Sequence, residues 1–282
     1  MEEMKSRPMI SFVIATYNRE KFLPDCLESL AQQTADRSDY EVVIVDNNST
    51  DGTEEICRRF IDRHPDLDVS YYKEGKQGLS HARNRGIAEA NGDLISFIDD
   101  DGIAEEGFAE ELLRFFRQHP EATAVGGKII PRFESGPPAW NNPYSSQVFF
   151  AHYDRGDDLF EYRGKGYPFG CNMTIRKAFF SAYGDFDTHL GRKGKGGLGG
   201  EEKALFERMH DHGKRYFYNP DLIVHHQIDE YRLEKPFLTS LSRGEGRSHR
   251  RLYCQTTFSF SCFRAFAMLI FKWAGAMVLA VV

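Results

Sequence analysis

The sequence lacks the features that define several common classes of protein. Its five cysteines are an odd number and form no Cys-x-x-Cys pair, a pattern that fits neither a disulfide framework nor a zinc site. Lys and Arg total 36 against 42 Asp and Glu, a net charge of -6, whereas nucleic-acid binding normally needs a clustered positive field. Residues 1–5 are charged and lead straight into an apolar run, so we expect no signal peptide. These absences favour a cytoplasmic protein with no nucleic-acid partner.

Three well-known motifs are also missing. No Gly-x-Gly-x-x-Gly follows the first apolar run, so the dinucleotide-binding fingerprint is absent. Residues 191–195 are superficially similar to a phosphate-binding loop, but they lack the Gly-x-x-x-x-Gly-Lys-Ser/Thr spacing. The sequence contains no Gly-x-Ser-x-Gly elbow, which carries the nucleophile of α/β-hydrolases. The chemistry must therefore be sought in other residues.

Short apolar runs alternate with amphipathic segments up to residue 130. Strands are expected at residues 9–15, 41–45, 69–73, 94–98 and 122–130, with helices at residues 18–30, 53–63, 80–90 and 105–119. Asn18 can cap the first of these helices. The alternation predicts right-handed βαβ units and a single α/β domain with a mostly parallel central sheet.

The regular alternation ends after residue 130. Residues 131–169 are rich in Pro, Gly, Asn and aromatic side chains, and a long irregular stretch inside a compact domain is usually a functional loop. The last predicted elements are a strand near residues 169–176, a Gly-rich loop at 191–200, a helix at 201–212 and a strand at 216–224.

Polar residues gather directly after three of the predicted strands. The three groups are Thr16, Tyr17 and Asn18; Asp46, Asn47 and Asn48; and Asp99, Asp100 and Asp101. In an open α/β sheet, ligands bind in the crevice outside the carboxyl ends of the strands. The three groups therefore predict one binding crevice.

The acidic group is suited to a divalent cation. Mg²⁺ and Mn²⁺ prefer carboxylate oxygens and bind through one or two of them plus substrate phosphates. Because alternate residues of an extended segment point the same way, Asp99 and Asp101 can face one ligand while Asp100 points elsewhere. The alternative is a solvated turn whose aspartates cap the helix that follows.

Two further segments can serve a nucleotide. Asp46, at the end of a strand, can accept hydrogen bonds from a base or ribose, or it can simply stabilise a turn. Gly78 precedes a predicted helix, whose first backbone N–H groups attract anions. Either Arg83 or Arg85 can grip a diphosphate with its planar guanidinium group, and the other is then a surface residue.

Two pairs of neighbouring residues can complete a catalytic site. Glu201 and Glu202 begin a predicted helix, where acidic residues are favoured by the helix dipole alone. As a functional alternative, one of the two carboxylates can deprotonate an acceptor hydroxyl. His225 and His226 point to opposite faces of a strand, so only one of them can reach the site.

Five fragments, in the same order along the chain, resemble glycosyltransferase family 2, whose members have the GT-A fold. They are SFVIATYNR at residues 11–19, VDNNSTDGT at 45–53, ARNRG at 82–86, FIDDD at 97–101 and GEE at 200–202, and the likeness covers about residues 8–228. The resemblance implies an inverting transfer of a sugar from a UDP- or GDP-linked donor to a hydroxyl acceptor, with Mn²⁺ or Mg²⁺ as cofactor. The Gln-x-x-Arg-Trp signature of processive polysaccharide synthases is absent, which favours addition of single sugars.

The resemblance also implies roles for individual residues. The nucleotide would contact Thr16, Tyr17, Asn18, Asp46, Asn48, Asp99 and Asp100, with Arg83 near its diphosphate. The metal ion would be bound by Asp101, Asp99 and His225. The family's base is commonly the Asp of a Glu-Asp pair, and this position holds Glu202, which leaves the choice between Glu202 and Glu201 open. Residues 169–173 resemble the loop beneath the active site that meets donor and acceptor.

A basic and then apolar segment, residues 229–282, follows the predicted catalytic domain of residues 1–228. Six Arg or Lys lie between residues 231 and 251, and residues 258–282 are apolar except for Arg264 and Lys272. This pattern suits the anionic cytoplasmic face of a membrane. An interfacial helix is at least as favoured as a full span, because Lys272 would cost about 2.5–3.5 kcal/mol at mid-membrane. The alternative is a helix docked on the catalytic domain or on a second subunit.

The leading hypothesis is therefore a membrane-associated glycosyltransferase acting on a lipid-linked or cell-envelope glycan. A sugar nucleotidyltransferase also places acidic metal ligands on a parallel sheet, but it normally has a Gly-rich loop and a lysine after its first strand. A nucleotide-binding or scaffolding protein that has lost its base is the non-enzymatic alternative, favoured only by Glu in place of Asp at residue 202.

Overall fold

The computed structural model describes residues 10–164, 166–193 and 199–253. The apolar segment at residues 258–282, for which we expected a membrane-associated helix, lies outside these residues. Within the part of the chain that is described, no helix combines the length and the apolar character needed to cross a membrane.

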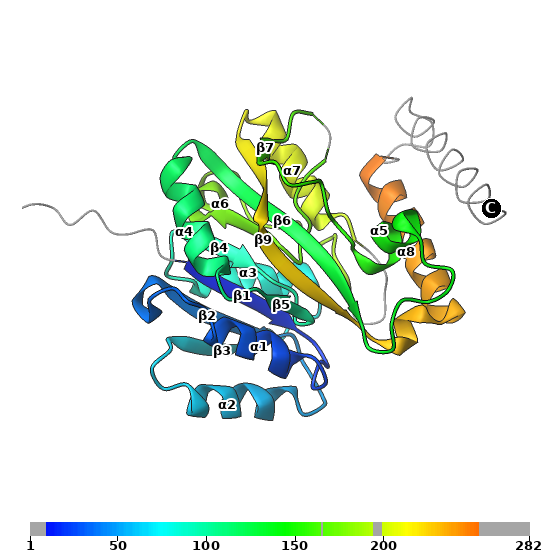
Figure 1. Ribbon diagram of the computed structural model, residues 1–282, viewed down its shortest axis with the longest axis horizontal. Helices are drawn as coiled ribbons and strands as arrows, with labels where there is room; N and C mark the ends of the chain where they lie inside the picture. The colour runs from blue at the N-terminus through cyan, green and yellow to red at the C-terminus, as the bar shows by residue number, and fades with distance from the viewer. Residues whose placement is uncertain (1–9, 165, 194–198, 254–282) are drawn as a thin grey trace, which may run out of the picture.

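Four parallel strands form the first part of the sheet (Figure 1). Their order across the sheet is β3 (Val69–Lys73), β2 (Tyr40–Asp46), β1 (Ile10–Thr16) and β4 (Leu94–Phe97). The helical connections are α1 (Leu23–Ala31), the 3-10 turn η1 (Arg37–Asp39), α2 (Thr53–Arg63) and α3 (Leu79–Glu89). Strands β1, β2 and β4 are almost entirely buried, because parallel strands of this kind are covered on both faces. Their sequences are accordingly continuous apolar runs.

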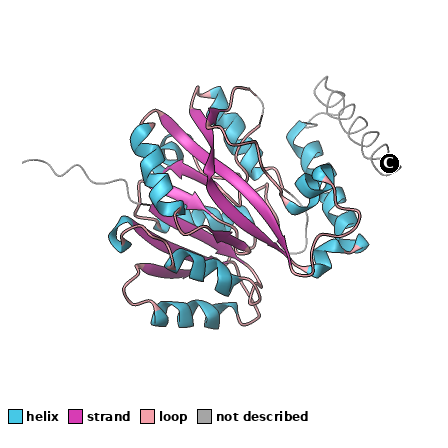
Figure 2. Ribbon diagram, in the orientation of Figure 1, coloured by secondary structure: helices cyan, strands magenta, loops and turns pink. Residues whose placement is uncertain are grey.

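The second part of the sheet mixes strand directions. It contains β5 (Gly102–Ala104), β6 (Ala122–Phe133), β7 (Phe160–Glu161), β8 (Met173–Arg176) and β9 (Arg215–Ile228). Strand β8 runs antiparallel to both β4 and β6, and β6 lies parallel to β9. The long β9 then pairs antiparallel with β5 and with β7. Figure 2 shows β6 and β9 as two long strands that cross the molecule together.

The remaining helices flank this second part. They are α4 (Phe108–Gln118), α5 (Pro143–Phe150), α6 (Lys177–Tyr183), α7 (Glu201–Asp211), the 3-10 turn η2 (Glu230–Leu233) and α8 (Lys235–Tyr253). In Figure 1, α5 and α8 lie at the far end of β6 and β9.

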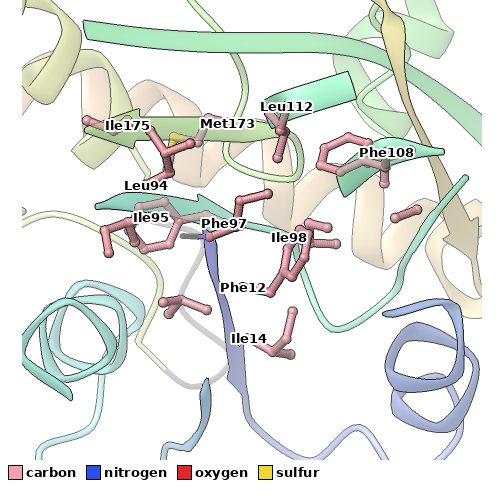
Figure 3. Packing of buried hydrophobic residues seen from close by; sticks show 14 of the residues in the cluster. Phe12, Ile14, Leu94, Ile95, Phe97, Ile98, Phe108, Leu112, Met173 and Ile175 are labelled. Atoms are coloured by element: carbon pink, nitrogen blue, oxygen red, sulfur yellow. The ribbon is translucent and has the colours of Figure 1, made fainter. Parts of the chain in front are cut away.

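The core joins both parts of the sheet. Phe12 of β1 contacts Phe108 of α4 through tilted rings, and Phe97 of β4 meets Phe180 of α6 edge to face. Figure 3 shows Phe12, Phe97 and Phe108 with aliphatic side chains from β4 and β8. Each such side chain contributes roughly 1.5–3 kcal/mol when it is removed from water. The shared core gives the crevice residues a rigid base.

The expected α/β class is confirmed, with informative local differences. Strand β8 and the short β5 make the sheet less parallel than the alternation predicted. The irregular stretch contains α5, which begins with a capping box between Asn142 and Ser145. Asn18 does not cap α1, which begins five residues later at Leu23 with Pro24 in its first turn. Asn18 instead has a positive φ of 53°, which an Asn tolerates better than most residues.

Candidate active site

The loops after β1 and β2 are tied together. The side-chain oxygen of Asn18 accepts a hydrogen bond from the backbone of Thr50 at 2.7 Å. The backbone N–H of Asn18 donates to the hydroxyl of Ser49 at 2.9 Å. The first two polar groups therefore form one surface, as their positions at the sheet edge predicted, and they are held in a fixed relative position.

The predicted nucleotide residues of these two loops divide into buried and accessible ones. Asp46 is buried, and its oxygens accept from the Ser49 backbone and the Tyr71 hydroxyl, each at 2.8 Å. Burial and the Asp46 carboxylate raise the pKa of Tyr71, so this hydroxyl stays a donor. Thr16 is also buried. Tyr17, Asn18 and Asn48 reach solvent and can meet a ligand.

The start of α3 is less suited to an anion than the sequence suggested. The Gly78 N–H donates to the side-chain oxygen of Asn47 at 2.6 Å. The next N–H, of Leu79, donates to the carbonyl of Arg192 at 2.9 Å. Two of the groups that would have bound a phosphate are thus already used inside the protein. Asn47, one of the polar residues after β2, connects the β2 loop to α3.

Arg83 lies inside the protein among three carboxylates. Its side chain is 2% exposed. Nη2 is 3.1 Å from Oδ1 of Asp99, and Nη1 is 3.2 Å from Oε1 of Glu201 and 3.1 Å from Oε1 of Glu202. The nearby carboxylates raise the pKa of Arg83 although burial alone would lower it. The expectation that this guanidinium grips a diphosphate does not fit its buried position.

Glu201 and Glu202 differ in access to solvent. The Glu201 side chain is 5% exposed and that of Glu202 is 25% exposed. Burial, with the neighbouring Glu202 charge, raises the pKa of Glu201 to about 7, although Arg83 opposes the shift. Oε2 of Glu201 is buried and has no hydrogen-bond partner among the described residues. Only Glu202 is accessible enough to meet an acceptor.

We predict that Glu201→Gln flattens the pH dependence of stability. The raised pKa means that the folded chain binds more protons than the unfolded chain between pH 4.5 and about 7. The free energy of unfolding therefore falls as the pH rises through this window, with a slope of up to about 1.4 kcal/mol per pH unit for one proton. Glutamine cannot titrate and removes this contribution. Urea unfolding at several pH values measures both slopes.

The difference in slope between the wild type and Glu201→Gln measures the contribution of Glu201 alone. Burial also raises the pKa of Asp100 to about 6 against the opposing Arg19 charge, but Asp100 titrates in both proteins and cancels in the difference. Equal slopes in the two proteins would show that Glu201 is ionised in the native state at neutral pH.

Asp101 is enclosed by two arginines and a histidine. Its Oδ2 is 3.0 Å from Nη2 of Arg232 and 3.3 Å from Nη2 of Arg19, while Oδ1 is 3.3 Å from Nε2 of His226. Burial alone would raise the pKa of Asp101, but the neighbouring His226, Arg232 and Arg19 outweigh it and hold this pKa well below its ordinary value. Arg19 also contacts Asp100 at 3.2 Å through Nε.

The structure places His226, rather than the His225 chosen from the sequence, beside the acidic group. Strand β5 pairs with β9 so that Gly102 lies opposite His226, and the two histidines point to opposite faces. Nε2 of His225 lies 3.1 Å from Oε1 of Glu105, away from Asp101. The correction follows from the register of a three-residue strand, which the sequence pattern did not reveal.

Asp101 and His226 offer donor atoms of the kind that divalent cations take, although both side chains are buried and Nη1 of Arg232 lies 2.9 Å from Nε2 of His226. Two ligands at right angles on an ion with bonds of about 2.1 Å are about 3.0 Å apart, close to the observed 3.3 Å between Oδ1 and Nε2. No cluster of three or more His, Cys, Asp or Glu suited to a metal occurs among the described residues. Substrate phosphates and water would therefore supply the remaining ligands, as is usual for Mg²⁺.

Three residues of the site were not assigned to it from the sequence: Arg19, His226 and Arg232. Arg232 was counted only among the basic residues of the C-terminal segment. The backbone N–H of Gln227 donates to the carbonyl of Asp101 at 2.8 Å, and this contact brings the end of β9 and then η2 to the site. Only the pairing of distant strands reveals that Arg232 belongs to the site.

Comparison with known proteins gives a consistent picture. The family model described as "Glycosyl transferase family 2" matches residues 11–184, which is more than half of the chain. A glucosyl-dolichyl phosphate glucuronosyltransferase of Haloferax volcanii is 29% identical over 247 residues, covering 86% of this chain and 76% of that protein.

Solved structures share the fold at low identity. The S. aureus TarS fragment 1–349 in complex with UDP-GlcNAc has a TM-score of 0.58 at 18% identity, with 89% of this chain and 68% of that chain covered. The mannosyltransferase PcManGT from Pyrobaculum calidifontis, in complex with GDP-Man and Mn²⁺, has a TM-score of 0.58 at 18% identity, with 97% and 81% covered. At this identity the likeness establishes a common fold.

Proposed function

The chain belongs to glycosyltransferase family 2 and is a glycosyltransferase, and from this premise we propose that it is an inverting, divalent-metal-dependent enzyme using a UDP- or GDP-linked sugar. The observation that carries the proposal is the convergence of three acidic residues on one buried arginine beside an Asp–His pair. The TarS complex with UDP-GlcNAc and the PcManGT complex with GDP-Man support the donor class, and the Mn²⁺ of the PcManGT complex supports the metal.

The donor would lie along the carboxyl edge of β1, β2 and β4. The accessible Tyr17, Asn18 and Asn48 would contact the base and ribose, with Thr16 and Asp46 forming the buried frame beneath them. Asp99, which is partly exposed, would contact the nucleotide. Asp101 and His226 would hold Mn²⁺ or Mg²⁺, which supplies positive charge to the departing diphosphate.

Glu202 is the proposed base. It would take the proton of the acceptor hydroxyl while the acceptor oxygen bonds to the anomeric carbon and the bond from that carbon to the diphosphate oxygen breaks. The accessibility of Glu202 beside the buried Glu201 supports this choice. The negative charge on the diphosphate would be offset by the guanidinium groups of Arg19 and Arg232 near Asp101.

The acceptor is proposed to be a lipid-linked glycan at the inner face of a membrane. The Haloferax relative is named for a dolichyl phosphate substrate, and the basic residues at 231–251 suit an anionic surface. The division into a catalytic domain at 1–228 and a C-terminal segment at 229–282 belongs to the same proposal. Family membership argues against the nucleotidyltransferase alternative, and the accessible carboxylate of Glu202 argues against a scaffold that has lost its base.

A thermal-shift panel of UDP- and GDP-sugars, each with and without Mn²⁺, tests the proposal. We expect one nucleotide class to raise the melting temperature only when Mn²⁺ is present, because a ligand at 100 times its Kd stabilises the native state by about 2.7 kcal/mol. Inorganic phosphate with Mn²⁺ is the control and should have little effect. A shift of equal size without metal would refute metal dependence, and no shift with any donor would refute the donor class.

A further inference from the structure

The buried Arg83 connects the donor side of the crevice to the proposed base. The three carboxylates around it come from separate parts of the chain: Asp99 follows β4, whereas Glu201 and Glu202 begin α7. Arg83 itself lies on α3. Its planar fork uses Nη2 for Asp99 and Nη1 for both glutamates. One rigid group therefore fixes the distance between the Asp99 and Glu202 carboxylates.

Aromatic rings hold this guanidinium in place. Its central carbon is 5.8 Å from the centre of the Phe97 ring and 5.5 Å from that of Phe186. Both rings are buried. If Arg83 turned outwards to reach a phosphate, it would give up its contacts with all three carboxylates at once, and separating buried ion pairs is unfavourable. The geometry therefore argues for a fixed arginine rather than one that follows the donor.

Gly170 lies in close contact with Arg83 and Glu202. A Cβ atom at this position would lie 1.8 Å from Oε1 of Glu202 and 2.5 Å from Nη2 of Arg83. A hydrogen bond from the Asn172 N–H to the Phe169 carbonyl, 2.9 Å long, closes the turn that contains Gly170. The backbone of this turn thus leaves room for the Glu202 carboxylate in its observed position and for no additional side-chain atom.

We propose that Arg83 is a positioning residue: it holds the Glu202 carboxylate in register with Asp99, and Gly170 completes the cradle. This inference rests on the proposed role of Glu202 as the base. It replaces the diphosphate contact that the sequence indicated for Arg83. Lysine at this position keeps the charge but offers a single ammonium group, which cannot reproduce a fork shared by three carboxylates.

The test compares Arg83→Lys with Arg114→Lys. Arg114 lies on α4, is 55% exposed and pairs with Glu111 through Nε at 2.6 Å, so it is the control for an Arg→Lys change outside the site. The donor that stabilises the wild type is used with Mn²⁺; turnover is measured with water as acceptor, and donor affinity by calorimetry. For Arg83→Lys we expect a kcat about 10²-fold lower, because displacement of a reacting group by about 1 Å can cost that much, with donor Kd changed less than about threefold. Arg114→Lys should match the wild type.

A kcat at saturating donor equal to that of the wild type, or donor binding weakened tenfold or more, would overturn the proposal. If Arg83→Lys does not fold, Gly170→Ala decides, because it keeps the arginine side chain but places a Cβ 1.8 Å from Oε1 of Glu202 and 2.5 Å from Nη2 of Arg83, so that this pair must shift. Gly170→Ala should also lower kcat while keeping donor Kd, and an unchanged kcat would reject the cradle. A fully active Glu202→Gln would instead reject the base itself, which distinguishes failure of the proposed function from failure of this inference.

Discussion

Glu202→Gln is expected to lower kcat by about 10²–10⁴-fold, the range typical for removal of a positioned general base. Glutamine has nearly the same shape as glutamate, and its side-chain oxygen can still accept a hydrogen bond from Nη1 of Arg83, which lies 3.1 Å from Oε1 of Glu202. It cannot take up the acceptor proton. Donor affinity should therefore stay close to that of the wild type, since the base acts on the acceptor. Release of nucleoside diphosphate measures kcat, and calorimetry with Mn²⁺ and donor measures affinity.

Glu201→Gln is the matched control for this experiment. Both residues begin α7 and contact the same nitrogen of Arg83, but Glu201 is buried behind the guanidinium. We expect a loss of kcat below about tenfold for Glu201→Gln, since this change affects only the surroundings of the base. If Glu201→Gln is the more damaging substitution, the base is Glu201 and the crevice must open to admit the acceptor. If both variants keep full activity, neither glutamate is the base.

Local sequence was enough to predict the positions of the polar loops and of every described strand except the short β5 and β7. Helix α2 and strand β3 have the predicted bounds, because apolar periodicity and turn residues act over a few positions. The direction of a strand, in contrast, is not encoded in its local sequence. The four residues of β8, Met173–Arg176, fit a parallel or an antiparallel neighbour equally well, and the sheet order decides between them. The capping residues Asn142 and Pro143 did carry a helix signal inside the irregular stretch.

The site residues were likewise predictable only where the local sequence determines their position. Asp99 and Asp101 follow a strand and could be placed from their neighbours alone. Whether Arg83 faces solvent or three carboxylates depends on α7, more than 100 residues later in the chain. The choice of His226 over His225 depends on the pairing of β5 with β9. Contacts between distant segments are therefore the part of the site that one sequence did not contain.

Asp101→Asn should have two separate effects, of which the first is loss of metal-dependent donor binding. Asp101 supplies the carboxylate of the proposed metal pair, and its Oδ1 lies 3.3 Å from Nε2 of His226. The melting-temperature rise with donor and Mn²⁺ should disappear. The second effect appears without metal, because two arginines and a histidine lose their charged partner. Breaking a buried ion pair from one side costs about 3–5 kcal/mol, measured by urea unfolding in the presence of a chelator.

The pH dependence of that second effect follows from the lowered pKa of Asp101. A carboxyl whose pKa is lowered on folding contributes stability above its ordinary value of 3.8, and this contribution is lost as the pH falls through the folded-state pKa. The wild type and Asp101→Asn should therefore converge in stability at strongly acid pH. Asp157→Asn is the control, since Asp157 pairs with Lys128 but is 94% exposed, and such a change usually alters stability by less than about 0.5 kcal/mol. A variant that loses stability yet keeps the metal-dependent shift would make Asp101 an anchor for Arg19 and Arg232 only. A variant that keeps its stability but loses the metal-dependent shift would mean that these arginines release Asp101 readily to the metal.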